Sequence, residues 1–162
     1  QSCHTCAKEV SMLDDIDKKL LAALQGNAHY TAQDLSERLN LSASQAGRRR
    51  QKLEADGYIS GYHAHLEASR IGLTVQAFVQ VQLRSHGPEE ARGFARLAEI
   101  RPEIISVWTL TGDSDYLLRI YCQDLSSLNH LIHNVILPHP AVARVQSQIV
   151  MDQLKQDAPL PT

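Results

Sequence analysis

The sequence lacks a strong net charge, a long apolar run and enough cysteines for a disulfide framework. The 162-residue chain has a net charge of −2, so it is not a polybasic coat for nucleic acid, and any nucleic-acid site must be a local patch. The longest apolar run is far too short to cross a membrane, and no basic-then-apolar leader opens the chain. We therefore expect a soluble, cytoplasmic protein without membrane contact.

The scarce cysteines also limit the metal and redox chemistry. Cys3 and Cys6 form the motif CHTC, but there is no second pair to complete a four-ligand zinc site, and Cys122 is remote. No strand and helix flank the motif as a thioredoxin-like redox site requires. We expect residues 1–12 to be a loosely ordered tail, and the role of CHTC stays open. No metal site or cofactor is expected.

Histidines are a second candidate for metal binding. His130 and His133 share a helix face at spacing i, i+3, and His139 follows. No acidic residue or cysteine lies near them in the sequence, so we interpret them as surface residues.

The N-terminal part of the sequence contains three short helical patterns. The first starts at Leu13 and ends at Gly26 and Asn27, with apolar residues repeating on one helical face. Thr31 can cap the second, with Asp34 three residues later as an approximate capping box. Ser42 can cap the third, which runs to about Ala55 or Asp56. The three- or four-residue gap between the second and third is a helix-turn-helix spacing.

The composition changes after residue 73. Residues 75–83 alternate, with valine, alanine and leucine on one face and phenylalanine and glutamine on the other, which predicts a half-buried strand. A helix from Pro88, strands at 104–110 and 116–122, a helix capped by Asp124 or Ser126 and a last strand near 141–154 follow. The order βαββαβ predicts a ferredoxin-like plait with both helices on one face. The open face would carry Phe78, Trp108 or its neighbours and glutamines, and a partner subunit would cover it.

We therefore predict an α+β chain with an N-terminal helix-turn-helix, winged-helix-like domain and a C-terminal ferredoxin-like domain. The expected ranges are a tail at 1–12, the helix-turn-helix domain at 13–58, a linker or strand at 59–73, the βαββαβ domain at 74–155 and a tail at 156–162.

Several motifs in this order resemble the Lrp/AsnC family of bacterial and archaeal regulators. LDDIDKKLLAALQ resembles the opening L-D-x-x-D-x-x-I-L-x-x-L-Q of the family, and RRRQKLEADGYISGY resembles its R-V-x-x-L-E-x-x-G-x-I-x-G-Y. TGDSDYLL is similar to G-x-x-D-Y-L-L, and ILPHPAVARVQSQIVMDQLK is similar to L-x-x-x-P-G-V-x-x-x-x-T-x-x-V-M-x-x-x-K. The resemblance covers residues 13–155. There are two departures from the family pattern. Arg50 stands where the family usually has an apolar residue, and Gly47 replaces a bulkier residue. Pro-Ala replaces Pro-Gly at 140–141.

The resemblance implies a transcriptional regulator that binds double-stranded DNA. It also implies a homodimer that assembles into a higher oligomer, such as an octamer, and a small effector, commonly an amino acid, bound by the C-terminal half near subunit contacts.

The basic run at residues 48–52 is the candidate DNA contact. From residue 13 to 66 there are seven basic and seven acidic residues, but four of the bases fall within five positions. Early residues of a recognition helix meet base edges, and later ones meet phosphates. Position 50 should face the other helices, so we expect Arg50 to extend along the core toward an acid such as Asp17. A solvated face balanced by nearby acids is the alternative. The candidates are Ser42, Ser44, Gln45, Arg48, Arg49, Arg50 and Lys52.

The TGDSDYLL turn is the candidate effector site. A Gly-Asp turn offers backbone amides for a carboxylate and two acids for an ammonium group, although an ordinary hairpin turn would have the same composition. The candidates are Gly112, Asp113, Asp115 and Tyr116, with Trp108, Leu110 and Gln148 as further lining residues.

Two other functions stay open at this point. Some haem-biosynthesis decarboxylases resemble the same two-part architecture and use histidines, of which this chain has eight, but no nucleophile–base pair or phosphate loop is evident and the basic third helix argues against an enzyme. An architectural DNA-compacting protein would differ from a regulator in showing little preference for one site over bulk DNA.

Overall fold

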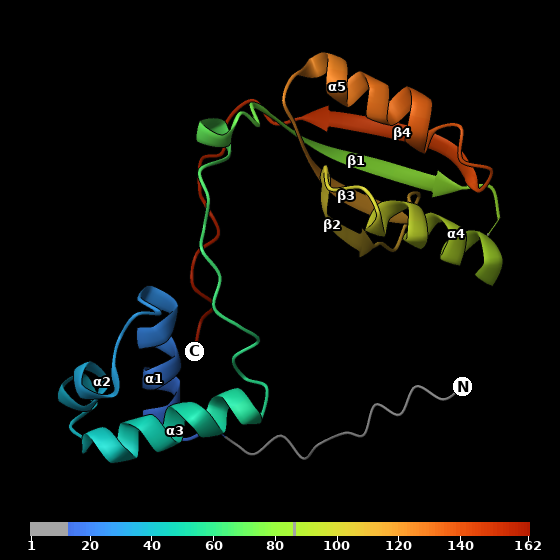
Figure 1. Ribbon diagram of the computed structural model, residues 1–162. Helices are drawn as coiled ribbons and strands as arrows, with labels where there is room; N and C mark the ends of the chain where they lie inside the picture. The colour runs from blue at the N-terminus through green and yellow to red at the C-terminus, as the bar shows by residue number, and fades with distance from the viewer. Residues whose placement is uncertain (1–12, 86) are drawn as a thin grey trace. The chain divides into compact units, whose positions relative to one another are not determined.

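The computed structural model describes residues 13–85 and 87–162, so the expected tail at 1–12, with Cys3 and Cys6, lies outside the described residues. The described chain forms two compact units (Figure 1). One runs to Ala64 and includes Lys155–Thr162, and the other spans His65–Leu154. None of the helices in the described part has the length and apolar character needed to cross a membrane.

The first unit contains three helices, and the second and third have the N-caps, Thr31 and Ser42, that the sequence predicts. The three helices are α1 (Asp15–Gly26), α2 (Ala32–Leu39) and α3 (Ala43–Ala55). Thr31 and Asp34 form a complete capping box at α2, and Ser42 forms one with Gln45 at α3. Both boxes satisfy backbone N–H groups that the first helical turn leaves without partners. Helices α2 and α3 therefore begin where the sequence places them, whereas α1 begins at Asp15, capped by Asp14, and not at Leu13.

A small apolar core holds these three helices together. Leu20, Leu35 and Ala46 are completely buried, one from each helix, and Leu53 is nearly so. Gly57 follows α3 with a left-handed backbone (φ +82°), which a glycine adopts without strain and which ends the helix. The core fixes which face of α3 turns inward, and hence which face remains for a partner.

Residues 59–73 follow one of the two predicted alternatives, a linker, and not the other, a strand. A strand was one of the two expectations for residues 59–73, but the only regular structure there is a 3-10 helix, η1 (Ala68–Ile71). All strand pairings among the described residues join β1–β4 to one another, so the extended segment before η1 has no strand beside it to pair with.

The second unit is a four-stranded antiparallel sheet with strand order β2-β3-β1-β4. Its elements are β1 (Val75–Leu83), α4 (Pro88–Glu99), β2 (Ile104–Thr109), β3 (Tyr116–Cys122), α5 (Leu125–His130), continued by the π-helical turns of η2 (Leu131–Ile136), and β4 (Val142–Ile149). This is the predicted βαββαβ plait. Asp124 caps α5 through the N–H of Ser127.

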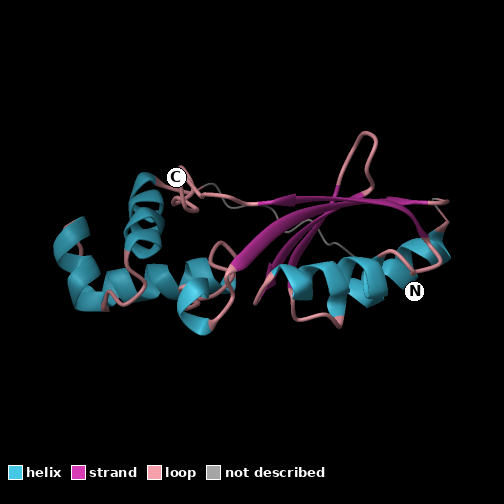
Figure 2. Cartoon of the chain, turned by 90° about the horizontal axis from the view of Figure 1, so that it is seen from above, coloured by secondary structure: helices cyan, strands magenta, loops and turns pink. Residues whose placement is uncertain are grey.

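The two faces of the sheet have different surroundings. Figure 2 shows both helices on the same side, where Ala77, Val79 and Val81 of β1 meet Phe94 of α4 in the core. On the open side, strand pairing aligns Trp108, Leu117, Gln80 and Gln146 in one row, and Ser106, Arg119, Phe78 and Gln148 in the next. The prediction of an uncovered face with Phe78, Trp108 and glutamines is confirmed.

Candidate nucleic-acid interface and effector site

The outward face of α3 carries polar and basic side chains. Ala46 and Leu53 are buried against α1 and α2, which leaves the opposite stripe exposed. This stripe consists of Ser44, Gln45, Arg48, Gln51, Lys52 and Ala55. Neither Arg48 nor Lys52 forms a side-chain ion pair within the described chain. Two cations on this stripe thus remain available to an anionic partner.

Two residues of the predicted DNA-contact set act in helix capping. Gln45 Oε1 accepts hydrogen bonds from the backbone N–H of Ser42 at 3.0 Å and from its hydroxyl at 3.2 Å. The Ser42 hydroxyl oxygen in turn accepts the N–H of Gln45 at 3.2 Å. A paired contact with adenine needs both the oxygen and the nitrogen of the glutamine amide. Gln45 would have to open its capping box to make one.

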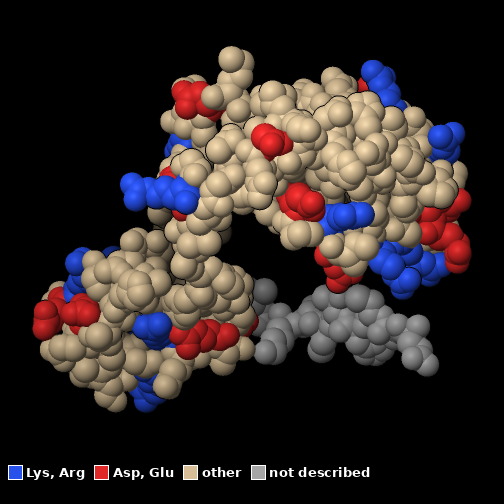
Figure 3. Space-filling model, turned by 45° about the horizontal axis from the view of Figure 1, so that its top comes forward, with Lys and Arg blue, Asp and Glu red and all other residues tan. Residues whose placement is uncertain are grey.

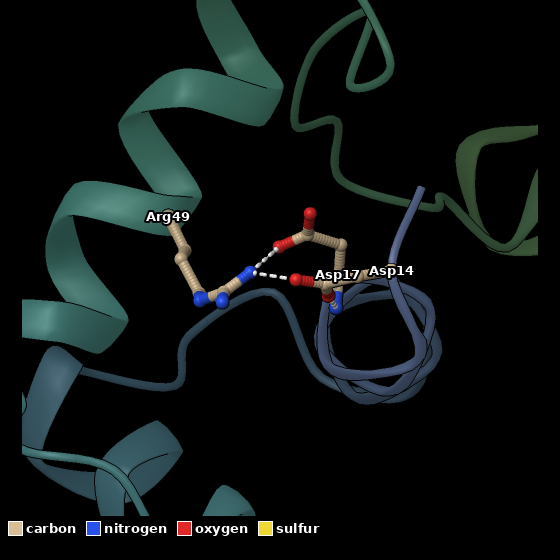
Figure 4. Close-up of polar contacts among 3 residues, drawn as sticks. All are labelled: Asp14, Asp17 and Arg49. Carbon is tan, nitrogen blue, oxygen red and sulfur yellow. Dashed lines mark hydrogen bonds and ion pairs between the residues drawn. The ribbon is translucent and has the colours of Figure 1, made fainter. Parts of the chain in front are cut away.

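Arg49, one of the predicted DNA contacts, points to the neighbouring helix, and 31% of its side chain is accessible. Its Nη1 donates to Asp14 Oδ2 at 2.7 Å and to Asp17 Oδ1 at 2.6 Å, which ties α3 to the first turn of α1 (Figure 4). These two carboxylates raise the pKa of Arg49, and the N–H of Asp17, followed by Arg49, lowers the pKa of Asp14. Arg49 therefore acts as a cross-link between α1 and α3.

Arg50 lies on the inner side of α3, as predicted, but its partner is not Asp17. Its Nε donates to Glu54 Oε1 at 3.0 Å and to the Tyr62 hydroxyl at 3.1 Å, and its Nη1 donates to the Tyr30 carbonyl at 3.0 Å. The acid that Arg50 reaches is Glu54, one turn away on the same helix, and not Asp17, which Arg49 already binds. Arg50 links α3 to the segment that leaves it.

Charges of both signs are mixed on one face of the molecule (Figure 3). The face drawn in Figure 3 shows basic and acidic side chains interspersed, without a continuous basic area. This agrees with the neutral balance of residues 13–66 and with ion pairs such as that of Arg49. An anion site on this chain is therefore local, as the net charge predicts.

The β2–β3 turn is held firmly against the end of β1. The N–H of Asp115 donates to the Val81 carbonyl at 3.0 Å, and Asp115 Oδ2 accepts the N–H of Leu83 at 2.7 Å. Gly112, with φ +110°, supplies the left-handed residue of the turn. Asp115 thus positions the turn, and Asp113 and Ser114 come to lie over the open face of the sheet.

Beside this turn the open face is hollowed. The hollow has a volume of ≈ 140 Å³ and is lined by Gln80, Gln82, Asp113, Ser114, Arg144 and Gln146. Ser114 Oγ donates to Gln80 Oε1 at 3.2 Å. The hollow brings Asp113 of the turn together with one base and three amides from the last two rows of β1 and their partners on β4.

The predicted effector residues are distributed more widely than the hollow. Asp113 is the one member of that predicted set that lines the hollow. Gly112 shapes the turn, and Leu110 donates its backbone N–H to the Asp115 carbonyl just after β2. Trp108 and Gln148 lie on the same open face but outside the hollow. Tyr116 is on the opposite, helix-covered face, where its ring stacks on Phe94 with centroids 5.0 Å apart.

Several residues near the two candidate sites were not among the predicted site residues. Gln51 lies on the exposed stripe of α3, three positions after Arg48, and helical spacing alone could have identified it. Gln80 and Gln82 were placed on the open face by strand alternation. Arg144 and Gln146 were not identified, because the register between β1 and β4 is not encoded in either strand by itself.

The two units together indicate a class of protein. A helix-turn-helix unit with an exposed basic stripe and a separate sheet unit with a polar hollow are the parts of a DNA-binding regulator that has a ligand-binding domain. Comparison with known proteins gives the same division. The model of the Lrp/AsnC ligand binding domain matches residues 76–160, and that of a winged helix-turn-helix DNA-binding domain matches residues 13–60.

Whole-chain comparisons support the same assignment. The DNA-binding transcriptional activator DecR of Escherichia coli is 33% identical over 150 residues, which cover 93% of this chain and 99% of DecR. A Neisseria meningitidis transcriptional regulator, solved in complex with L-methionine, is similar with a TM-score of 0.88 and 35% identity, covering 93% of this chain and 97% of the other. An AsnC family regulator from Agrobacterium tumefaciens has a TM-score of 0.85 and 30% identity, with coverages of 92% and 97%. The chain belongs to the Lrp/AsnC family, whose members are transcriptional regulators and not enzymes.

Proposed function

We propose that the chain is a sequence-specific transcriptional regulator whose C-terminal unit senses an amino acid and joins subunits into dimers and larger assemblies. The observation that carries the proposal is the capped α3 helix, which buries Ala46 and Leu53 and presents a polar, basic stripe outward. A helix in this arrangement can enter the major groove with its first turns toward the base edges.

Within this stripe we assign base reading to Ser44, Arg48 and Gln51, and phosphate contact to Lys52. They lie at spacings of three and four residues on one exposed face. Gln45 and Ser42 contribute through the cap that begins the helix, and Arg49 and Arg50 hold the helix in place. A guanine contact by arginine and an adenine contact by glutamine would give the protein its sequence preference.

An amino acid as effector is supported by a relative and by chemistry. The Neisseria regulator was solved with L-methionine, and its 35% identity spans 93% of this chain. An amino acid needs partners for an ammonium and a carboxylate, and the turn around Asp113 lies close to Arg144 across the hollow. The metabolite would act by favouring one arrangement of subunits over another, and so change DNA affinity.

Self-assembly is supported by the open face of the sheet. Phe78, Leu117 and Trp108 contribute apolar surface there, and Trp108 keeps 44% of its surface exposed in the single chain. Two copies that pack their open faces together would bury this surface about a two-fold axis. A dimer would also present two α3 helices to two half-sites on DNA.

The test is a selection of duplexes bound by the full chain from a random pool, followed by anisotropy titrations at several salt concentrations. We expect Arg48→Ala to weaken binding of the selected duplex roughly 5- to 150-fold and to relax sequence preference at one position. Lys52→Ala should weaken all duplexes alike and lower the salt slope by about one. Arg96→Ala, an exposed arginine of α4, is the charge-matched control. Equal affinity for selected and bulk DNA would instead indicate an architectural protein.

A further inference from the structure

We infer that a cluster of three side chains, the Arg50 lock (Arg50, Glu54 and Tyr62), fixes the path of the chain out of the helix-turn-helix unit and so sets the half-site spacing that a pair of subunits accepts. Arg50 and Tyr62 are then positioning residues, which act through the path of the chain and not by touching DNA. The inference rests on the proposed function, because it requires a dimer that places two α3 helices on two half-sites.

Each side chain of the Arg50 lock bonds to the other two. Arg50 Nε donates to Glu54 Oε1 at 3.0 Å and to the Tyr62 hydroxyl oxygen at 3.1 Å. The Tyr62 hydroxyl donates in turn to Glu54 Oε1 at 2.8 Å, and the Arg50 guanidinium lies 4.8 Å from the centre of the Tyr62 ring. The Tyr62 hydroxyl, followed by Arg50, lowers the pKa of Glu54. Its carboxylate is therefore charged at neutral pH, which strengthens these bonds.

The Arg50 lock is itself attached to the helices at two points. Arg50 Nη1 donates to the Tyr30 carbonyl just before α2, at 3.0 Å, and Glu54 is a residue of α3. Only 27% of the Arg50 side chain is accessible, so these contacts are partly shielded from solvent. An apolar side chain at position 50, which the family pattern usually has, could make none of them. The lock therefore belongs to this chain and not to that pattern.

Tyr62 holds a stretch of chain that has little other support. Tyr58 and Ile59 pack against the apolar core of the three helices, but the chain beyond them is exposed. Within the described chain, Ser60, Gly61 and Tyr62 form no backbone–backbone hydrogen bond. The side chain of Tyr62 therefore connects this stretch to α3.

Release of the Arg50 lock would lengthen the free part of the linker by residues 60–62. Three extended residues span about 10 Å, which is the length of about three base pairs of DNA. A longer tether lets each α3 reach half-sites at more separations, but it lowers the effective concentration of the second helix at the best separation. An intact lock should thus give a sharp preference for one spacing, and an open lock a broad preference.

The C-terminal tail is the rival to the Arg50 lock as a second attachment of the same unit. Lys155–Thr162 belongs to the helix-turn-helix unit, where the Gln25 side chain accepts the N–H of Leu160 at 2.6 Å and donates to its carbonyl at 3.0 Å. These two bonds depend on one exposed, uncharged side chain, whereas the lock contains a charged pair. Gln25→Ala breaks both bonds of the tail and leaves the lock intact.

The experiment measures the anisotropy of duplexes that carry two selected half-sites, at spacings changed by up to about three base pairs, on binding the full chain. We expect the wild type to lose roughly 10-fold or more in affinity within about two base pairs of its best spacing, and Arg50→Leu and Tyr62→Phe to lose less than about 3-fold. Tyr62→Phe removes the hydroxyl and keeps the ring, so it opens the lock with little change in packing. All three proteins should bind a single half-site with similar affinity.

Arg49→Ala is the matched control for a general loss of stability. It also removes an arginine that bonds to carboxylates within the unit, but Arg49 joins α3 to α1 and not to the chain that leaves α3. This variant should keep the sharp spacing preference of the wild type. A broad preference in Arg49→Ala would overturn the inference, because a loosened unit would then explain the effect without the lock.

Other results would also overturn the inference. A sharp preference retained by either Arg50→Leu or Tyr62→Phe would show that the lock does not set the spacing, and a broad preference in Gln25→Ala alone would assign that role to the tail. Failure of the proposed function would be seen in the wild type itself. It would bind paired and single half-sites alike, or select no duplex, and the inference would fail with it.

Discussion

Arg48 and Arg49 are adjacent in the sequence but have different surroundings. Arg48 is exposed without an ion pair in the described chain, whereas Arg49 donates to two carboxylates of α1. Only 13% of the Asp17 side chain is accessible, so this contact is partly shielded from solvent and salt. The two arginines should therefore respond differently to mutation.

We expect Arg49→Ala to lower the Tm of the N-terminal unit by about 2–8 °C, because it removes the link between α1 and α3. Arg48→Ala should leave the Tm nearly unchanged and reduce DNA affinity. Differential scanning calorimetry and DNA anisotropy on the same two variants measure both effects. An Arg49→Ala protein with wild-type Tm and strongly reduced affinity would place Arg49 on the DNA.

For single residues, helical spacing predicts the side of the helix on which a side chain lies but not all of its partners. The spacing of α3 correctly placed position 50 on the inner side, because the angle around a helix follows from the sequence number alone. Glu54, at i+4 on the same helix, was a predictable partner of Arg50. Tyr62 and Tyr30 were not, because they lie 12 and 20 residues away in the sequence. The capping role of Gln45 was predictable from the pattern S-x-x-Q. The sequence analysis instead named Gln45 only as a candidate for contact with DNA.

Among the secondary-structure elements, the carboxylates that cap helices make the stability of the fold depend on pH. The N–H and hydroxyl groups of Thr31 donate to the Asp34 carboxylate and lower its pKa, and the pKa of Asp14 is lowered mainly by the N–H of Asp17. A carboxylate with a lowered folded-state pKa stabilises the fold above its unfolded-state pKa. This contribution is lost as the pH falls through the folded-state value.

The N-terminal unit should therefore lose stability as the pH falls below about 4. Asp34→Asn keeps an oxygen acceptor for Thr31 but has no charge, so this variant should be less stable at pH 7 and lose less between pH 5 and pH 2. Chemical denaturation across this range is the measurement, with Asp152→Asn, an exposed acid outside any helix, as control. A variant curve parallel to wild type would rule out the contribution of Asp34.

The layer between sheet and helices depends on Phe94. This side chain is completely buried. Its ring centroid lies 5.0 Å from that of Tyr116 and 6.0 Å from that of His139. We expect Phe94→Ala to reduce the free energy of unfolding by about 3–5 kcal/mol, and Phe94→Leu to reduce it less. Leu125→Ala, at a leucine with 58% exposure, should change it by less than about 0.5 kcal/mol. Urea denaturation measures the free energy of unfolding of the three variants. Similar losses at positions 94 and 125 would contradict a core built around Phe94.

Element types and their order were predictable because the local signals are strong. Alternation marks β1, and Thr31, Ser42 and Asp124 mark helix starts where they occur. The π-helical turns after His130 and the absence of a strand beside the linker were not, since both depend on packing and pairing with distant segments. The lining of the hollow belongs with them, because it follows from the β1–β4 register.

For the whole molecule, the open sheet face decides whether two chains can pair and so present two α3 helices to two half-sites. Phe78 lies near the centre of that face, paired with Arg119 on one side and Gln148 on the other. Phe78→Glu would place a charge in the proposed contact between two copies, where it would be buried without a partner. We expect this variant to sediment as a monomer in analytical ultracentrifugation and to keep the circular dichroism of the wild type.

The same variant should lose at least about 100-fold in affinity for the selected duplex, since each α3 would then bind its half-site alone. Its affinity for bulk DNA should fall much less, because a single helix still contacts phosphates through residues such as Lys52. Asn129→Glu, an exposed residue of α5 on the opposite side of the sheet, adds the same charge without touching this face and should keep wild-type mass and affinity. If Phe78→Glu remained a dimer, assembly would have to use another surface, and the open face would need a different explanation.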